Sequence, residues 1–485
     1  MLQLIIRQMN WGIIGSLFGF VIGFLIKIYL IDIVGVSQWG KYVSAHAFAT
    51  AFDTILSLGI PFILLKFLPD YLDKNSKAAK FLIRRVLIYA FKVSFIFIVL
   101  MYIFSPYIDE YIYIKIDDFS FILFLVAIHT PISIFTGIIT SLYRSVLKIK
   151  ELILYSVFII VPLRAILTLF VFQYTDNIIY FVFIELLTGT LSLSVLFYLF
   201  NRREFSLSNI QSEVNDFEPG LFLYGKKIYA NSLATFFGSQ SLAIILSIML
   251  PPSQIGVFSI LLTITGVTLF LIQNLNKIFA PVISKLYSDG KIEELNHLYK
   301  RTTFIINFIA IPFSILIIYF SRQILLLYDD TGEILHYLPY LYILMGARII
   351  SLLAGSSGTL MIMAGLESKE LLIQILKGIL ITLFSIFFIK EYGLFIIVIL
   401  FLVFTLLVNV MQLFFINSKI RINPFSRNLF LLILLSLPMF YYAMNNDNEF
   451  NIYQLFWMPI LVYTPYFLIF FSTIRSLYLD SIHHD

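Results

Sequence analysis

Two arginines stand inside long apolar segments of this sequence, where they are the side chains best placed to do chemistry. Arg164 follows Pro162 in the middle of one segment, and Arg348 lies near the middle of another. A charge at the centre of a bilayer costs about 2.5 to 3.5 kcal/mol on insertion scales, so a retained charge usually faces a cavity and has a task there. The two arginines therefore predict a polar cavity inside a membrane protein.

A polar stripe adds groups that could couple to an ion. His46, Thr50, Asp53 and Ser57 follow one another at helical spacing and share one face of a helix. We predict ion coupling through Asp53, Glu185 or His46. Hydrogen bonding between helices is the alternative for the stripe, and a structural ion pair with Arg164 is the alternative for Glu185.

A corresponding stripe lies in the second half of the chain and comprises Ser259, Thr263, Gly266, Gln273 and Lys277. Gln273 and Lys277 are candidate ligand contacts on that stripe. Lys27 and Lys377 lie nearer the ends of apolar segments, so they either line the cavity or extend to the membrane interface.

These residues need helices that cross a membrane. Of the sequence, 60% is hydrophobic and 13% is charged, and the mean hydropathy is +0.95, whereas soluble domains have about 25% charged residues. Apolar runs long enough to cross about 30 Å of hydrocarbon recur along the whole chain. Backbone groups in lipid must bond internally, which favours helices, and the runs are too long for barrel strands. We expect an all-α integral membrane protein with fourteen spans, at 11–33, 42–65, 86–104, 119–141, 152–174, 178–199, 228–249, 255–279, 303–324, 336–363, 370–388, 393–416, 428–444 and 453–473.

Lys and Arg residues gather in alternate loops. The segments 66–85, 200–227 and 280–302 are basic, whereas the intervening loops carry acids such as Asp109 and Asp329. The positive-inside rule makes the basic loops and both termini cytoplasmic. The net charge of +5 then reflects contact with anionic lipid headgroups, and we expect no nucleic-acid partner.

Two short matches indicate a duplication. Ser-Gln-Trp-Gly at 37–40 corresponds to Ser-Gln-Ile-Gly at 253–256, an offset of 216, and Lys-Glu at 150–151 corresponds to Lys-Glu at 369–370, an offset of 219. We expect two parallel six-helix halves, 1–210 and 211–420, around a central cavity, followed by an extra two-helix segment, 421–485. The second offset aligns Arg348 with His129, which becomes a further candidate for the cavity.

Common catalytic motifs are missing. The sequence has no phosphate-binding loop, no H-E-x-x-H and no G-x-S-x-G motif, and it has no cysteine. The longest expected outward loop, 105–118, is too short to fold into a catalytic domain. We predict a transporter and not an enzyme, with no cofactor and no metal site.

Several motifs resemble the polysaccharide transporter family of Wzx-type flippases, in the MOP superfamily that also contains MATE exporters and lipid II flippases. They are the glycine-rich first span, Val-Gly-Val-Ser-Gln-Trp-Gly at 34–40, Leu-Gly-Ile-Pro at 58–61 with Lys66 and Leu68, Leu-Met-Ile-Met-Ala-Gly at 360–365 before Glu367 and Lys369, and Glu-Tyr-Gly at 391–393. The resemblance covers nearly the whole chain.

The resemblance implies a flippase that moves an undecaprenyl-diphosphate-linked oligosaccharide, an O-antigen or other surface polysaccharide unit, across a bacterial inner membrane by alternating access. Arg164, Arg348, His129, Lys27 and Lys377 would bind the diphosphate. The implied partners are this lipid-linked glycan, membrane lipids, H+ or Na+, and polysaccharide polymerase or chain-length proteins. The alternatives are a MATE-like multidrug or cation antiporter, and a membrane glycosyltransferase or polysaccharide polymerase.

Overall fold

The computed structural model describes residues 2–57, 59–74, 76–204, 226, 229, 233, 236, 240–446 and 451–482. Side chains are described for the same residues except 2–10, 73, 74, 76, 204, 271, 277, 278 and 472–482. Every regular element in these ranges is a helix, which confirms the all-α prediction. The chain divides into two compact units, Met1–Val257 and Phe258–Asp485. The predicted boundary at residue 210 lies outside the described residues.

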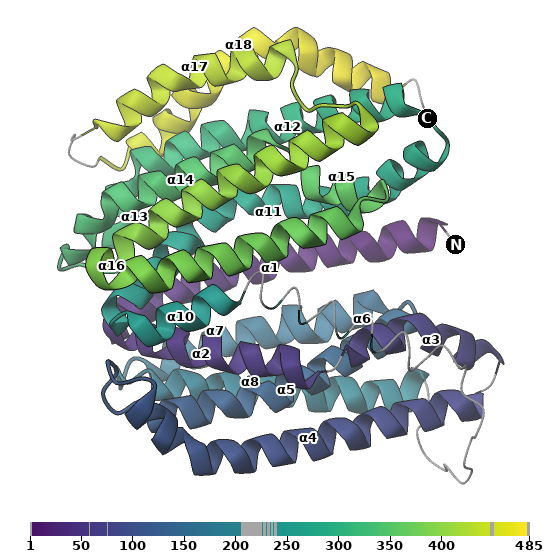
Figure 1. Ribbon diagram of the computed structural model, residues 1–485, viewed down its shortest axis with the longest axis vertical. Coiled ribbons are helices and arrows are strands. Elements are labelled where there is room, and N and C mark those ends of the chain that lie inside the picture. The colour runs from purple at the N-terminus through teal and green to yellow at the C-terminus, as the bar shows by residue number, and fades with distance from the viewer. Residues whose placement is uncertain are drawn as a thin grey trace. The chain divides into compact units, whose positions relative to one another are not determined.

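The first unit contains helices from the N-terminus to residue 249 (Figure 1). They are α1 (Leu2–Val34), α2 (Val36–Leu56), α3 (Ile60–Lys74), α4 (Ser76–Tyr111), α5 (Ser120–Ser145), α6 (Ile149–Ile153), the π-helix η1 (Leu154–Ile159), α7 (Ile160–Val171), α8 (Ile179–Leu199), the π-helix η2 (Phe200–Glu204) and α10 (Ser241–Met249). The apolar core of this unit joins α3, α4, α5 and α8, with Leu64, Ile83, Ile139 and Leu142 fully buried.

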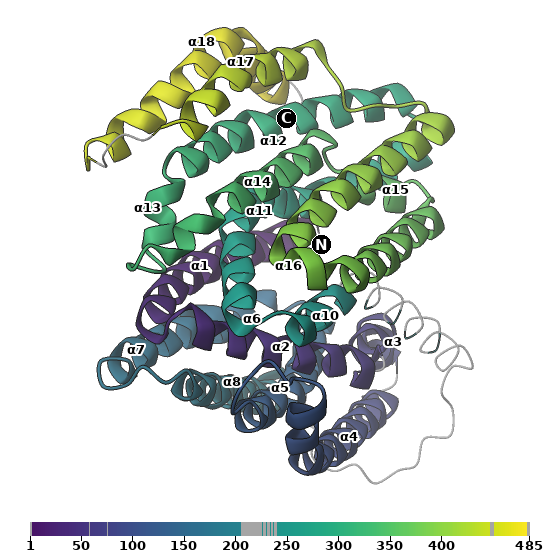
Figure 2. The same cartoon turned by 60° about the vertical axis from the view of Figure 1, so that its left-hand side comes forward.

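The helix α11 (Pro252–Ser288) begins in the first unit and continues into the second. The remaining elements of the second unit are α12 (Ile292–Tyr319), α13 (Ser321–Leu326), the 3-10 helix η3 (Glu333–Tyr337), α14 (Leu338–Leu353), α15 (Ser357–Met363), α16 (Glu367–Ile420), α17 (Arg427–Met444) and α18 (Gln454–Ile482). The two C-terminal helices α17 and α18 both pack on α12 (Figure 2).

Eleven described helices are long and apolar enough to span a membrane, and the bent pair α2 and α3 can supply a twelfth span. Gly393 interrupts α16 with φ 57° and ψ −137°, so this element holds both the expected span 370–388 and the expected span 393–416. Most of the expected span 228–249 lies outside the described residues. These helices are consistent with fourteen spans.

Two expected spans are broken, and glycines explain both breaks. The expected span 42–65 is divided into α2 and α3, which meet at 42°, because Gly59 adopts φ 67° just before Pro61. The expected span 336–363 is divided into α14 and α15 at Gly355, where φ is 62°. A Cβ at Gly355 would overlap the Thr303 hydroxyl of α12, so only glycine allows this approach.

Side chains of α12 satisfy the backbone at the second break. Tyr299 donates its hydroxyl to the Ala354 carbonyl at 2.6 Å, and Asn307 donates its amide to the Leu352 carbonyl at 2.8 Å. The last carbonyls of a helix have no partner within the helix, and leaving them unpaired in an apolar interior is costly. These bonds pair the backbone at the end of α14, where residues 354–356 connect it to α15.

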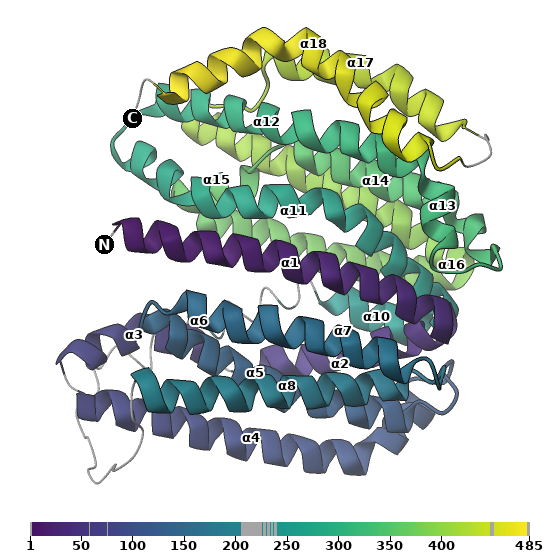
Figure 3. The ribbon, with the colours of Figure 1, turned by 180° about the vertical axis from the view of Figure 1, so that it is seen from behind.

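The helix α1 packs along α6, η1 and α7 (Figure 3). A Cβ at Gly15 would overlap the Ile153 side chain, and one at Gly19 would lie 3.2 Å from Val157. The glycine-rich first span therefore makes a close helix contact at these two positions, whereas nothing lies within 4 Å of the Cβ positions at Gly12 and Gly23.

Candidate functional site

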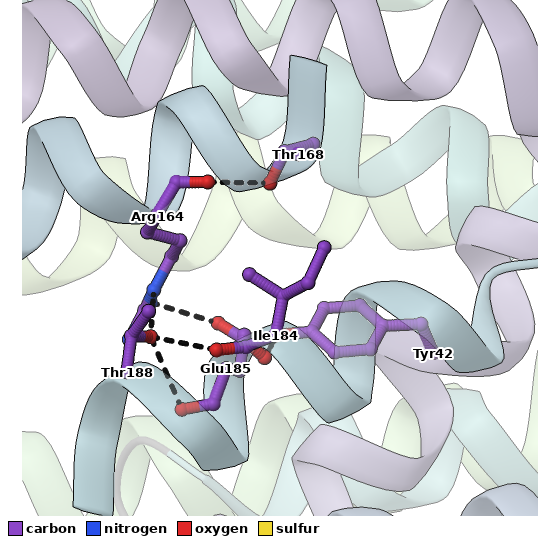
Figure 4. Close-up of polar contacts among 6 residues, drawn as sticks. All are labelled: Tyr42, Arg164, Thr168, Ile184, Glu185 and Thr188. Atoms are coloured by element: carbon purple, nitrogen blue, oxygen red, sulfur yellow. Dashed lines mark hydrogen bonds and ion pairs between the residues drawn. The ribbon is translucent and has the colours of Figure 1, made fainter. Parts of the chain in front are cut away.

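In the first unit, Arg164 of α7 forms an ion pair with Glu185 of α8 (Figure 4). The Arg164 Nη1 to Glu185 Oε1 distance is 3.0 Å, and Arg164 Nε donates to the Thr188 hydroxyl at 3.0 Å. The Tyr42 hydroxyl of α2 donates to the other carboxylate oxygen of Glu185 at 2.7 Å. Glu185 thus neutralises the charge of Arg164 within the first unit. This is the structural ion pair that the sequence predicted as the alternative to ion coupling through Glu185.

A π-helix and a proline precede Arg164 in its span. Pro162 has no backbone N–H, so it cannot donate to the carbonyl of Phe158, which lies in η1. Widened π-turns occur where the α-helical bonding pattern is interrupted, and they are frequent at functional sites. The wide turn precedes α7 directly, and α7 presents Arg164 to α8.

The predicted polar stripe of α2 faces α5 in the same unit. The rings of His46 and His129 have centroids 6.1 Å apart, and the Ser133 hydroxyl of α5 donates to Asp53 Oδ2 at 2.9 Å. The Thr50 hydroxyl donates to the His46 carbonyl at 2.8 Å. The three candidate ion-coupling residues therefore all lie in the first unit, in contact with neighbouring helices of that unit.

Lys27 of α1 lies over an aromatic ring. Its Nζ is 5.0 Å from the centroid of the Trp39 ring at the start of α2. A cation over the face of an indole is attracted by the ring quadrupole. Lys27 thereby holds α1 against α2.

The second unit contains a polar pocket of about 300 Å³ between α11, α14, α15 and α16. Arg348, Lys377 and Gln273 line it, so the structure brings three sequence-predicted site residues together. The side chain of Lys277, the fourth predicted residue of this unit, lies outside the described residues. The pocket is also lined by Ser356, from the break between α14 and α15, and by Ser357 and Gly358 in the first turn of α15.

Arg348 and Lys377 share one aromatic ring. The guanidinium carbon of Arg348 lies 4.9 Å from the centroid of Phe401, and Lys377 Nζ lies 5.9 Å from it. Within the part of the chain that the structure describes, neither cation has a carboxylate within 4.0 Å. Arg348 Nε, although buried, has no hydrogen-bond partner there. The pocket therefore holds two positive charges with capacity to bind an anion.

The same pocket also contains an acidic group, the carboxylate of Glu370, a residue that is only 7% exposed. Gln412 Nε2 donates to both carboxylate oxygens at 2.9 Å, and Gln374 Nε2 donates to Glu370 Oε1 at 2.8 Å. Sequence reasoning missed these residues. The available signal was helical spacing, because Glu370, Gln374 and Lys377 lie four and three residues apart on one helix face.

The comparisons with protein families match most of the chain. The family described as polysaccharide biosynthesis protein matches residues 5–287, and the MatE family matches residues 229–365. The search of curated proteins found no match.

The structure is similar to several solved transporters. Lipid II flippase MurJ in an inward closed conformation has a TM-score of 0.73 at 15% identity, covering 95% of this chain and 99% of that one. An inward-facing multidrug resistance MATE family transporter of the MOP superfamily has a TM-score of 0.67 at 13% identity, covering 81% and 94%. A MOP superfamily transporter from Pyrococcus furiosus has a TM-score of 0.59 at 14% identity, covering 86% and 95%. At these identities the likeness shows the fold, and it confirms the MOP-type architecture expected from the sequence.

Proposed function

The chain belongs to the polysaccharide biosynthesis protein family of the MOP superfamily, and from this membership we propose that it is a Wzx-type flippase for an undecaprenyl-diphosphate-linked oligosaccharide. The oligosaccharide is an O-antigen or another surface polysaccharide unit. The flippase moves it from the inner to the outer leaflet of a bacterial inner membrane by alternating access. Both termini lie in the cytoplasm, as the distribution of Lys and Arg among the loops predicts.

The observation that carries this proposal is the pair of cations in the second unit. Arg348 and Lys377 lie on one phenyl ring in a pocket of about 300 Å³ and have no carboxylate partner among the described residues. A diphosphate supplies negative charge to two cations that share their pocket only with the carboxylate of Glu370 among the lining residues, and a guanidinium matches the geometry of phosphate oxygens. Arg164 contributes less to substrate binding, because Glu185 already neutralises it.

The physical need for such a pocket follows from the substrate. A glycan and a diphosphate cannot enter hydrocarbon with their polar groups unpaired, because the cost of burying them is prohibitive. The pocket supports transport by replacing water around the diphosphate with fixed cations. The lipid tail needs no such partner, since the apolar side chains exposed on the helices match the bilayer.

The test replaces the two cations. In a strain that lacks the chromosomal gene, Arg348→Ala and Lys377→Ala should each lower surface polysaccharide about 10- to 100-fold, the loss expected when a hydrogen-bonded charge is removed. Arg322→Ala is the control, because Arg322 is exposed on α13 outside the pocket. Full polysaccharide in the double variant, at unchanged protein level, would contradict the proposal.

A multidrug antiporter is the second candidate, and the MatE match to residues 229–365 favours it. Among the residues that line the pocket, the cations Arg348 and Lys377 outnumber the one carboxylate, Glu370, so the pocket disfavours a cationic drug and we rank this candidate below the flippase. Expression in an efflux-deficient host distinguishes the two. Resistance to cationic dyes that Arg348→Ala leaves intact would favour the antiporter.

A further inference from the structure

The polar wall of the pocket in the second unit is a connected network that begins at Glu370. The carboxylate accepts three hydrogen bonds, two from Gln412 and one from Gln374, and Ser357 donates its hydroxyl to Gln412 Oε1 at 2.6 Å. A carboxylate offers about four acceptor positions, so Glu370 retains capacity for a further donor. All four residues line the pocket.

Two more polar atoms of this pocket have no partner. The Ser356 hydroxyl, in a residue only 5% exposed, and Asn276 Oδ1 are buried and make no hydrogen bond to any described residue. A buried polar atom without a partner costs about 1 to 3 kcal/mol, so native structures rarely keep one that nothing satisfies. A ligand with several hydroxyl groups would pair with these atoms.

The space beside the carboxylate depends on glycine. A Cβ at Gly358 would lie 3.1 Å from Glu370 Oε1 and 3.3 Å from Gln412 Nε2, closer than ordinary van der Waals contact. The absence of that Cβ leaves room beside the carboxylate, and Gly358 and Glu370 both line the pocket. The volume of about 300 Å³ is at the lower end for small-molecule sites and suits one sugar with its phosphate, not a whole oligosaccharide.

We propose that this polar wall binds the hydroxyl groups of the sugar attached to the diphosphate, so that the pocket recognises the glycan as well as its anchor. The inference rests on the proposed function. Arg348 and Lys377 hold the phosphates, and Glu370, Ser356 and Asn276 bind the first sugar. Hydrogen bonds of this kind discriminate strongly between sugars, because a sugar without the matching hydroxyl group leaves buried polar atoms of the pocket unpaired.

The experiment measures binding to the purified full-length protein by native mass spectrometry. The probes are undecaprenyl diphosphate alone and the same lipid bearing one glucose or one N-acetylglucosamine. We expect the wild-type protein to bind at least one sugar-bearing lipid more tightly than the bare lipid. Ser356→Ala should weaken binding of that lipid about 5- to 30-fold and leave undecaprenyl diphosphate binding unchanged. Glu370→Gln should weaken binding of that lipid by a similar factor relative to the bare lipid, because the loss of a negative charge from the pocket of Arg348 and Lys377 favours the diphosphate of both probes equally. Arg348→Ala should weaken binding of all probes.

We do not expect Ser356→Ala to misfold, because the Ser356 hydroxyl makes no hydrogen bond to any described residue and its removal therefore breaks none. The sugar site is overturned if Ser356→Ala and Glu370→Gln, at wild-type melting temperature, change the binding of bare and sugar-bearing lipid by the same factor or change neither. A wild-type protein that binds the bare lipid and shows no preference for either sugar also overturns it. A wild-type protein that binds none of the probes overturns the proposed function as well.

Discussion

Gly40 and Gly256 lie in a reciprocal contact between the first turns of α2 and α11. A Cβ at Gly40 would overlap the carbonyl oxygen of Pro252, and a Cβ at Gly256 would overlap the carbonyl oxygen of Val36. Each carbonyl belongs to the residue four positions before a glycine of the pair, and the same offset of 216 relates 36 to 252 and 40 to 256. The duplicated motif of the sequence therefore packs against its own copy.

Because the two glycines are in such close contact, we expect an added methyl group at either one to lower the stability of the protein. Gly40→Ala or Gly256→Ala should destabilise the protein by about 1 to 3 kcal/mol, because the backbones of α2 and α11 must move apart to fit a Cβ. The measurement is the thermal midpoint of the detergent-solubilised protein. Gly266→Ala is the matched control on α11, where nothing lies within 4 Å of the added atom. If the two glycines tolerate alanine as Gly266 does, the contact is looser than the structure indicates.

The ion pair between Arg164 and Glu185 gives a second prediction. Glu185→Ala should cost about 2 kcal/mol, because it leaves Arg164 partly buried without its counter-charge, and Arg164→Ala should cost a similar amount. The double variant should recover part of the loss, which a double-mutant cycle of thermal midpoints measures. Strict additivity of the two single effects would show that the pair contributes nothing through its charge.

Transport assays on the same variants separate structure from function. If Arg164 serves only to hold α7 against α8, the double variant of Arg164 and Glu185 should retain surface polysaccharide in proportion to its folded amount. A stable double variant without polysaccharide would instead give this pair a part in transport.

Asp53 gives a third prediction, since we propose that it takes part in ion coupling. Asp53→Asn keeps the size of the side chain and the acceptor for Ser133, but it can no longer gain or lose a proton. In vesicles, transport by this variant should no longer respond to an imposed proton or sodium gradient. Ser133→Ala is the control, because it removes the hydrogen bond and keeps the carboxylate. A gradient response equal to that of the wild type in Asp53→Asn would remove Asp53 from the coupling.

Local patterns in the sequence predicted the helical architecture and the mid-span charges, because hydropathy and spacing are properties of neighbouring residues. The break at Gly355 was not predictable in this way. It depends on Thr303 approaching the backbone and on Tyr299 and Asn307 satisfying the carbonyls beside it, and these residues lie in another helix.

The polar wall of the pocket was missed for the same reason. Glu370 and Gln412 are 42 residues apart in the sequence, and each by itself resembles a polar residue near the end of a span. Arg348 and Lys377 were singled out because charge is conspicuous in an apolar segment. The ring of Phe401 that joins them was not, since the sequence contains 51 phenylalanines.

Phe401 supplies the last prediction. The centroid of its ring lies 4.9 Å from the Arg348 guanidinium carbon and 5.9 Å from Lys377 Nζ. Each cation–π contact is worth about 0.5 to 2 kcal/mol, and together they hold the two cations at one pocket. Phe401→Leu keeps an apolar side chain and removes the ring, so the cations should separate and undecaprenyl diphosphate should bind roughly 10-fold more weakly. Phe384→Leu is the control, because Phe384 is 43% exposed on α16 and does not line the pocket. Unchanged binding in Phe401→Leu would mean that the two cations bind the diphosphate without a shared aromatic support.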